Sequence, residues 1–175
     1  MPHVGTGLPA DLAARLNPTA LSLADTDWHL PRVYDVVREM GATLLVAMQS
    51  RYVIDLNRPP DLNFGAVDGH SCDPAWTEAI LAPVRAQSDD SWVLNGRYKG
   101  GQINRSNGLG AGGVPAMQLE KAQDIDMDES ASFALLEDRV ARLRPLLKHC
   151  LQAATDWAEA VSVAYFPLRA PGFGR

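Results

Sequence analysis

The sequence predicts an α/β fold, in which helices cover the faces of a sheet. Short continuous apolar runs such as residues 42–48 have the pattern of buried parallel strands. Segments with helical spacing and helix-capping residues alternate with these runs, as they do in domains that pack helices on a sheet. A chain of 175 residues can bury a substantial core as one domain. We therefore expect a single domain over residues 1–166, followed by an irregular tail at 167–175.

The N-terminal quarter is predicted to be helical. Residues 10–16 can form a short helix that ends at an Asn-Pro pair. The segment 25–27 offers carboxylate and hydroxyl caps, and Pro31 suits a first helical turn. A second helix is thus expected from about residue 28 or 30 to residue 40, with Gly41 as a left-handed cap.

Strand-like segments follow this helical region. The runs at 42–48 and 52–56 are apolar, and those at 91–95 and 98–105 combine apolar residues with glycines. Residues 114–120 alternate between apolar and polar side chains, which is typical of a strand. We expect 42–48 and 114–119 to lie in one sheet.

Two longer helices are predicted in the second half. Asp73-Pro74 can begin a helix that runs to about Gln87, with Pro83 as a kink or break. A long helical tract is expected from Ser130 to about Val163, interrupted by Pro145. Its apolar residues fall at helical spacing: Phe133, Leu136, Val140, Leu143, Leu147 and Leu151.

Composition excludes several classes of function. The net charge of −5 gives no electrostatic footprint for nucleic acid, whose binding proteins are usually basic. No apolar run approaches the roughly 20 residues of a membrane helix, and the first residues lack the pattern of a signal peptide. Cys72 and Cys150 lie in no metal or redox spacing, so we expect reduced thiols in a cytoplasmic protein.

Histidine and carboxylate residues near the start could hold a metal. His3 stands in "PHVGT", and "DTDWH" places Asp25, Asp27 and His29 on one face if the segment is extended. Such ligands with an open position suit a catalytic zinc. The alternative is that the two aspartates cap a helix and His29 is a surface residue, which the segment taken alone favours.

Three arginines and a glutamate extend the candidate site. Arg51, Arg58 and Arg105 stand at the ends of strand-like segments, and their planar forks suit a substrate with more than one carboxylate. For any one of them a surface salt bridge is the simpler interpretation. Glu120 ends a strand-like run, where it could be a general base or a solvated terminus.

Five strings in order resemble one enzyme family. They are "PHVGTGLPADLAARL", "DTDWHLPRVYD", "SRYVIDLNRPP", "NGRYKGGQINR" and "MQLEKAQDIDMDE". Together they resemble N-formylglutamate deformylase, also called N-formylglutamate amidohydrolase, and cover most of the chain to about Glu129. The resemblance implies a mixed sheet flanked by helices, as in zinc carboxypeptidases and aspartoacylase-like enzymes. It also implies metal-assisted hydrolysis of N-formyl-L-glutamate to formate and L-glutamate, in histidine degradation.

The resemblance also implies roles for individual residues. His3 would be a ligand of zinc or another divalent ion, and Asp27 a second ligand or its support. Glu120 would be the base that takes the proton of the attacking water. The substrate carboxylates would be held by four residues: Arg51, Asn57, Arg58 and Arg105.

The chain departs from the family pattern at one junction above all. In the family, a long segment with an Asp-Ala-His-Ser motif follows "SRYVIDLNRPP", whereas here Pro60-Asp61 joins the two sides directly. The expected histidine ligand and part of the sheet are therefore missing. His70 in "DGHS" imitates the motif, but its neighbours match the downstream family segment, so we expect a loop residue.

Other departures concern residues around the site. Ser106 and Pro115 replace histidines of the family pattern, and Pro31 stands where an acidic residue is usual. The family has a strand that leads into the histidine, whereas here Met1 immediately precedes Pro2-His3. Three hypotheses follow. The chain is a zinc-dependent deformylase with impaired catalysis, or a degenerate member that binds glutamate-like acids, or a rearranged reading frame with no selected role.

Overall fold

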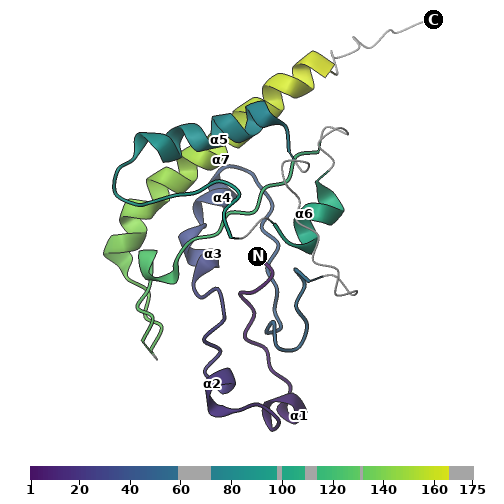
Figure 1. Ribbon diagram of the computed structural model, residues 1–175, viewed down its shortest axis with the longest axis vertical. Helices are drawn as coiled ribbons and strands as arrows, with labels where there is room; N and C mark the ends of the chain where they lie inside the picture. Colours follow the sequence, from purple (N-terminus) through teal and green to yellow (C-terminus); the bar gives the residue numbers. More distant parts are fainter. Residues whose placement is uncertain (59–71, 98–99, 109–113, 131, 166–175) are drawn as a thin grey trace, which may run out of the picture.

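The computed structural model describes residues 1–58, 72–97, 100–108, 114–130 and 132–165 (Figure 1). Helices are the regular elements of these segments. They are α1 (Ala10–Ala13), α2 (Pro18–Leu21), α3 (Leu30–Val33), α4 (Val36–Glu39), α5 (Pro74–Ala86), α6 (Gln102–Asn107), the 3₁₀ helix η2 (Gln123–Ile125) and α7 (Glu137–Tyr165).

The predicted sheet is not formed in the described part of the chain, so the expectation of a mixed α/β sheet is wrong. Only isolated bridges join the extended segments there, such as Gly7 with Gln49 and Met127 with Leu135. The run at 42–48 is extended but exposed, with Leu45 78% accessible. A buried strand needs neighbours on both edges and cover on both faces, and no described segment gives them.

One extended pairing does form, between the N-terminal segment and residues 45–50. Gly7 donates its N–H to the Met48 carbonyl (3.0 Å) and accepts from the Ser50 N–H (2.9 Å). The two backbones are very close, because a Cβ placed on Gly5 would lie 2.2 Å from the Gln49 carbonyl oxygen. Glycine is therefore required there, and the pairing brings the N-terminal residues alongside the segment that leads into Arg51.

The other strand predictions are also wrong for the residues that the structure describes. Residues 51–53 form a turn, in which the buried Ser50 accepts from the Val53 N–H through its carbonyl (2.9 Å) and from the Tyr52 N–H through its hydroxyl (3.2 Å). The run 98–105 contributes α6 instead of a strand. Residues 91–95 and 115–119 carry no regular structure.

The helix predictions hold better, with corrected bounds. Helix α5 begins where expected, since the Asp73 side chain accepts from the Ala75 N–H (2.7 Å). The helix predicted up to residue 40 is divided into α3 and α4. Helix α7 starts at Glu137, seven residues later than expected, because Asp128 and Asp126 pair with Ala134 and Leu136 in a small hairpin-like loop.

The core lies on the inner face of α7. Val140, Leu143 and Leu147 of α7 pack on Val33 of α3, and all four are nearly inaccessible to solvent. Helix α5 lies alongside α7, as Figure 1 shows. Helices α1 and α2 are at the far end of the molecule from α7 (Figure 1). No helix among the described residues is long and apolar enough to cross a membrane. The tail at 167–175 lies outside the described residues.

Candidate functional site

The candidate site is centred on a histidine held between two carboxylates. His3 Nε2 lies 2.6 Å from Asp55 Oδ1, and His3 Nδ1 lies 3.8 Å from Asp27 Oδ2. A backbone hydrogen bond from the Asp27 N–H to the His3 carbonyl (3.0 Å) aligns the two segments. The His3 side chain is only 13% exposed, so the arrangement is partly shielded from water.

Asp55 decides which ring nitrogen of His3 carries a proton. An ionised carboxylate only accepts hydrogen bonds, so the short contact requires the proton on Nε2. The lone pair of neutral His3 is then on Nδ1, on the side of Asp27. A histidine that ligates a metal usually donates its other ring N–H to such a carboxylate.

Asp55 is also the meeting point of two arginines. Arg51 donates to Asp55 Oδ2 (3.0 Å), and Arg58 Nε lies 3.5 Å from the same oxygen. Burial acts to raise the pKa of Asp55, but hydrogen bonds from His3, the Asn57 backbone and Arg51 outweigh it and lower the pKa below its usual value. Asp55 therefore stays ionised and fixes both guanidinium groups beside His3.

Asn57 connects this cluster to α6. Its carbonyl accepts from the Gln102 N–H (3.0 Å) and its Oδ1 from the Ile103 N–H (3.2 Å), so it satisfies the first turn of α6 from outside the helix. A Cβ on Gly101 would lie 2.3 Å from Asn57 Oδ1, which explains the glycine. Asn57 thereby positions the helix that carries Arg105.

Glu120 joins the network through Gln118. Asn57 Nδ2 donates to Gln118 Oε1 (3.2 Å), and Gln118 Nε2 donates to the Glu120 carboxylate. The next residue, Lys121, forms an ion pair with the fully buried Asp126 (2.5 Å), which anchors this segment to the core. Glu120 itself is exposed, so its carboxylate is accessible to water.

The "DTDWH" segment does not place its three polar residues on one face. Asp27 faces His3, whereas Asp25 accepts from the Tyr52 hydroxyl (2.9 Å). His29 has a left-handed backbone (φ 62°), and its Nε2 lies 2.6 Å from the Phe133 carbonyl oxygen. His29 therefore belongs to the contact with the loop before α7, where Trp28 also stacks on Phe133.

Most of the predicted site residues are thus brought into one network. Arg51, Asn57 and Arg58 gather around Asp55 beside His3, and Glu120 is linked to them through Gln118. Arg105 lies half-buried on α6. Asp55 and Gln118 had not been singled out, although Asp55 stands between Arg51 and Arg58 at the spacing of ion pairs on one turn. His70 lies outside the described residues.

The described residues provide two of the ligands that a metal ion would need. Two ligands of one tetrahedral zinc are separated by roughly 3.3–3.5 Å, so His3 Nδ1 and Asp27 Oδ2 are nearly at the right separation. A catalytic zinc usually has three protein ligands. Within the described segments, no group of three or more His, Cys, Asp or Glu residues is arranged to hold a metal ion.

Comparisons with known proteins show which family the chain belongs to. The family model of N-formylglutamate amidohydrolase matches residues 1–63 and 59–127, which is most of the chain and includes every residue of the network. The chain belongs to the N-formylglutamate amidohydrolase family. Two relatives are N-formylglutamate deformylases of Pseudomonas aeruginosa and Pseudomonas putida, 30% and 29% identical, with 90% of this chain and 91% of each relative covered. No solved structure matches.

The comparisons also support an internal shortening of the family pattern. The two matched stretches overlap at residues 59–63, around the Pro60-Asp61 junction. The alignment with each relative extends over 243 residues, more than the 175 of this chain. Each alignment therefore contains residues of the relative that are aligned with no residue of this chain.

Proposed function

We propose that this chain hydrolyses N-formyl-L-glutamate to formate and L-glutamate, at a rate far below that of a complete family site. The observation that carries the proposal is the placement of His3 between Asp27 and Asp55, with two arginines on the same Asp55 carboxylate. Membership of the amidohydrolase family supports the choice of reaction. The two Pseudomonas relatives carry the deformylase name.

The arginines would bind the two carboxylates of the substrate. Arg51 and Arg58 converge on Asp55, and the planar guanidinium of arginine is suited to bind a carboxylate bidentately. Arg105 on α6 would receive the second carboxylate. Asn57 would act by positioning α6, since both polar atoms of its side chain are engaged by Ile103 and Gln118.

The proposed metal, zinc or another divalent ion, would be held by His3 Nδ1 and the Asp27 carboxylate. When bound, such an ion polarises a carbonyl and makes water more acidic. Asp55 would hold the His3 ring in the required tautomer. Two protein ligands bind a metal ion more weakly than the usual three, and this is the physical reason why we expect slow hydrolysis.

Glu120 is the proposed general base. It is exposed, and Gln118 orients one carboxylate oxygen while the other remains accessible. In the reaction it would accept the proton of the attacking water as the C–O bond forms at the formyl carbon. The C–N bond of the substrate then breaks, and Glu120 gives the proton to the substrate nitrogen, which becomes the amino group of the product L-glutamate.

A second candidate function is binding of glutamate-like acids without catalysis. It is favoured by the incomplete donor set among the described residues, because groups that act as a unit in catalysis fail together. The arginine cluster does not depend on a metal, so it would still bind a dicarboxylate. Either function takes a small molecule as partner, and we propose a cytoplasmic location.

A titration and an assay separate the two functions. Calorimetric titration with N-formyl-L-glutamate should show saturable binding that Arg105→Ala weakens about tenfold or more, because a charge-assisted contact is lost. Arg15→Ala, at an exposed arginine after α1, is the matched control and should bind normally. Absence of binding by the unaltered protein would refute both functions.

Formate release in the presence of zinc then tests catalysis. We expect slow release that Glu120→Gln abolishes, together with less than one tightly bound zinc per chain. Release that Glu120→Gln leaves unchanged would show that this site does not catalyse it. Binding without any release would favour the acid-binding function.

A further inference from the structure

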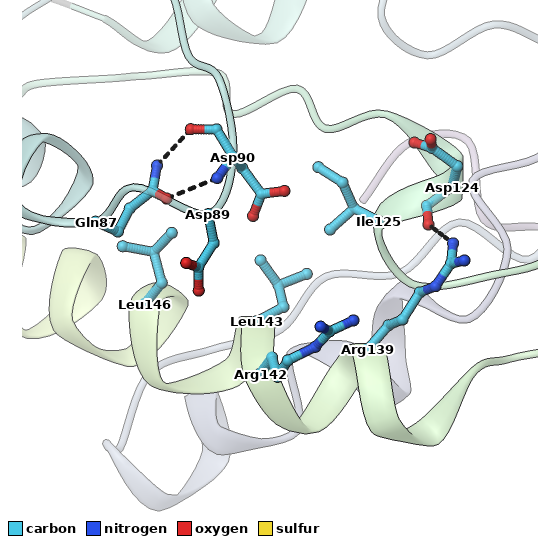
Figure 2. A pocket seen from close by; sticks show the side chains of 9 residues that line it. All are labelled: Gln87, Asp89, Asp90, Asp124, Ile125, Arg139, Arg142, Leu143 and Leu146. Atoms are coloured by element: carbon cyan, nitrogen blue, oxygen red, sulfur yellow. Dashed lines mark hydrogen bonds between the residues drawn. The ribbon is translucent and has the colours of Figure 1, made fainter.

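A cavity between the segment after α5, the 3₁₀ helix η2 and α7 has no role in the proposed reaction. Its volume is about 370 Å³, at the lower end of the roughly 300–1,000 Å³ of small-molecule pockets. Figure 2 shows its three walls: the segment after α5 with Asp89 and Asp90, the 3₁₀ helix η2, and the face of α7 with Arg139 and Arg142. None of the residues assigned to hydrolysis lines it.

The walls of the cavity are held in place by hydrogen bonds. Gln87 accepts from the Asp90 N–H and donates to the Asp90 carbonyl, both at 2.8 Å, which closes the turn after α5. Arg139 of α7 donates to the Asp124 carbonyl and so fixes η2 to α7 (Figure 2). The two bonds to Asp90 use only its backbone, so its carboxylate is left available.

Two carboxylates and a guanidinium group line this cavity without forming ion pairs among the described residues. Asp89, Asp90 and Arg142 form no ion pair or side-chain hydrogen bond with the residues that the structure describes. The acids come from the segment after α5 and the arginine from α7, so the two charges are on different walls. Three apolar side chains also line the cavity: Ile125, Leu143 and Leu146.

We propose that this cavity binds a free α-amino acid with an apolar side chain. The ammonium group would face the Asp89 and Asp90 carboxylates, and the carboxylate would face Arg142, in charge-assisted contacts. The side chain would lie on Leu143 and Leu146, which removes apolar surface from water. A dicarboxylate such as N-formyl-L-glutamate is a poor fit, because it has no ammonium and would meet like charges.

The test uses L-leucine and two analogues that each lack one charge. N-acetyl-L-leucine has no ammonium group, and 3-methylbutylamine has no carboxylate. Calorimetric titration of the full chain should show saturable binding of L-leucine, and each analogue should bind about tenfold more weakly or worse. Equal affinity for all three compounds would overturn the proposal, because it would show that the charges play no part.

Single substitutions test whether L-leucine binds in this cavity. Arg142→Gln and Asp90→Asn should each weaken L-leucine binding about tenfold, and both positions are exposed, so folding is preserved. Arg38→Gln, at an exposed arginine of α4, is the control. Arg105→Ala should leave L-leucine binding unchanged, which separates this cavity from the hydrolytic site. Unaltered binding by both cavity variants, or no L-leucine binding at all, would refute the proposal.

Discussion

At the scale of single residues, Asp55 has the most connections in the candidate site. It accepts from His3, Arg51 and the Asn57 backbone, and it lies beside Arg58. Each of these contacts depends on a charged carboxylate. The same residue therefore fixes the histidine tautomer, holds two guanidinium groups and forms the turn that leads to Asn57.

A residue-scale prediction follows from the lowered pKa of Asp55. A lowered pKa means that the charged form stabilises the fold above the usual pKa, near 4, and that this contribution is lost as the pH falls through the folded-state value. We expect Asp55→Asn to reduce the free energy of unfolding at pH 7 by roughly 1–2 kcal/mol. Urea unfolding followed by tryptophan fluorescence measures this change in the free energy of unfolding.

The pH dependence provides the check on this prediction. The difference between Asp55→Asn and the unaltered protein should narrow as the pH is lowered from about 5 through the usual pKa near 4, because the unfolded chain then binds a proton that the folded chain still excludes. Asp25→Asn, which changes an exposed acid whose carboxylate accepts from the Tyr52 hydroxyl, serves for comparison. A difference that stays constant over this range would contradict the role given to Asp55.

At the scale of elements, the residues that cap a helix determine where it begins. Helix α5 has a local cap in Asp73, which the sequence shows directly. Helix α6 has a distant cap in Asn57, 45 residues before its first residue, so its sequence alone resembles a strand. A local capping residue can be found by inspection, whereas a tertiary cap depends on a contact between distant segments.

The local cap of α5 gives an element-scale prediction. Asp73→Ala removes the acceptor for the Ala75 N–H and should lower the free energy of unfolding by about 1 kcal/mol. Thermal unfolding followed by circular dichroism would detect it. Asp89→Ala changes an exposed acid beyond the end of α5, whose side chain forms no hydrogen bond or ion pair among the described residues, and should change the free energy of unfolding by less than about 0.5 kcal/mol. Equal effects of both changes would argue against the cap.

At the scale of the whole molecule, apolar burial is uneven. The inner face of α7 packs against α3, whereas the segment at 42–56 exposes many apolar side chains, including Leu45, Met48 and Ile54. In an α/β domain a run of this kind is covered on both faces. Among the described residues, no segment covers the run at 42–56 in that way, and these apolar side chains remain exposed.

A matched pair of leucines tests this uneven distribution. Leu147→Ala, at a site 3% exposed, should lower the free energy of unfolding by about 2–5 kcal/mol, because it leaves a cavity in the core. Leu45→Ala, at a site 78% exposed, should change it by less than about 0.5 kcal/mol. Denaturant unfolding of both variants measures the difference. A large loss for Leu45→Ala would mean that the run at 42–48 is buried in solution.

The sequence by itself determined the family and the start of α5. Both depend on local features, namely the motif strings and the Asp73 cap. Tertiary structure alone decided that the apolar runs form no sheet among the described residues, that residues 102–107 are helical, and that Asp55 joins His3 to the arginines. The physical reason is that a strand, a distant cap and a site each require partners from other segments. A residue pattern records the preference of one segment, but not whether its partners are present.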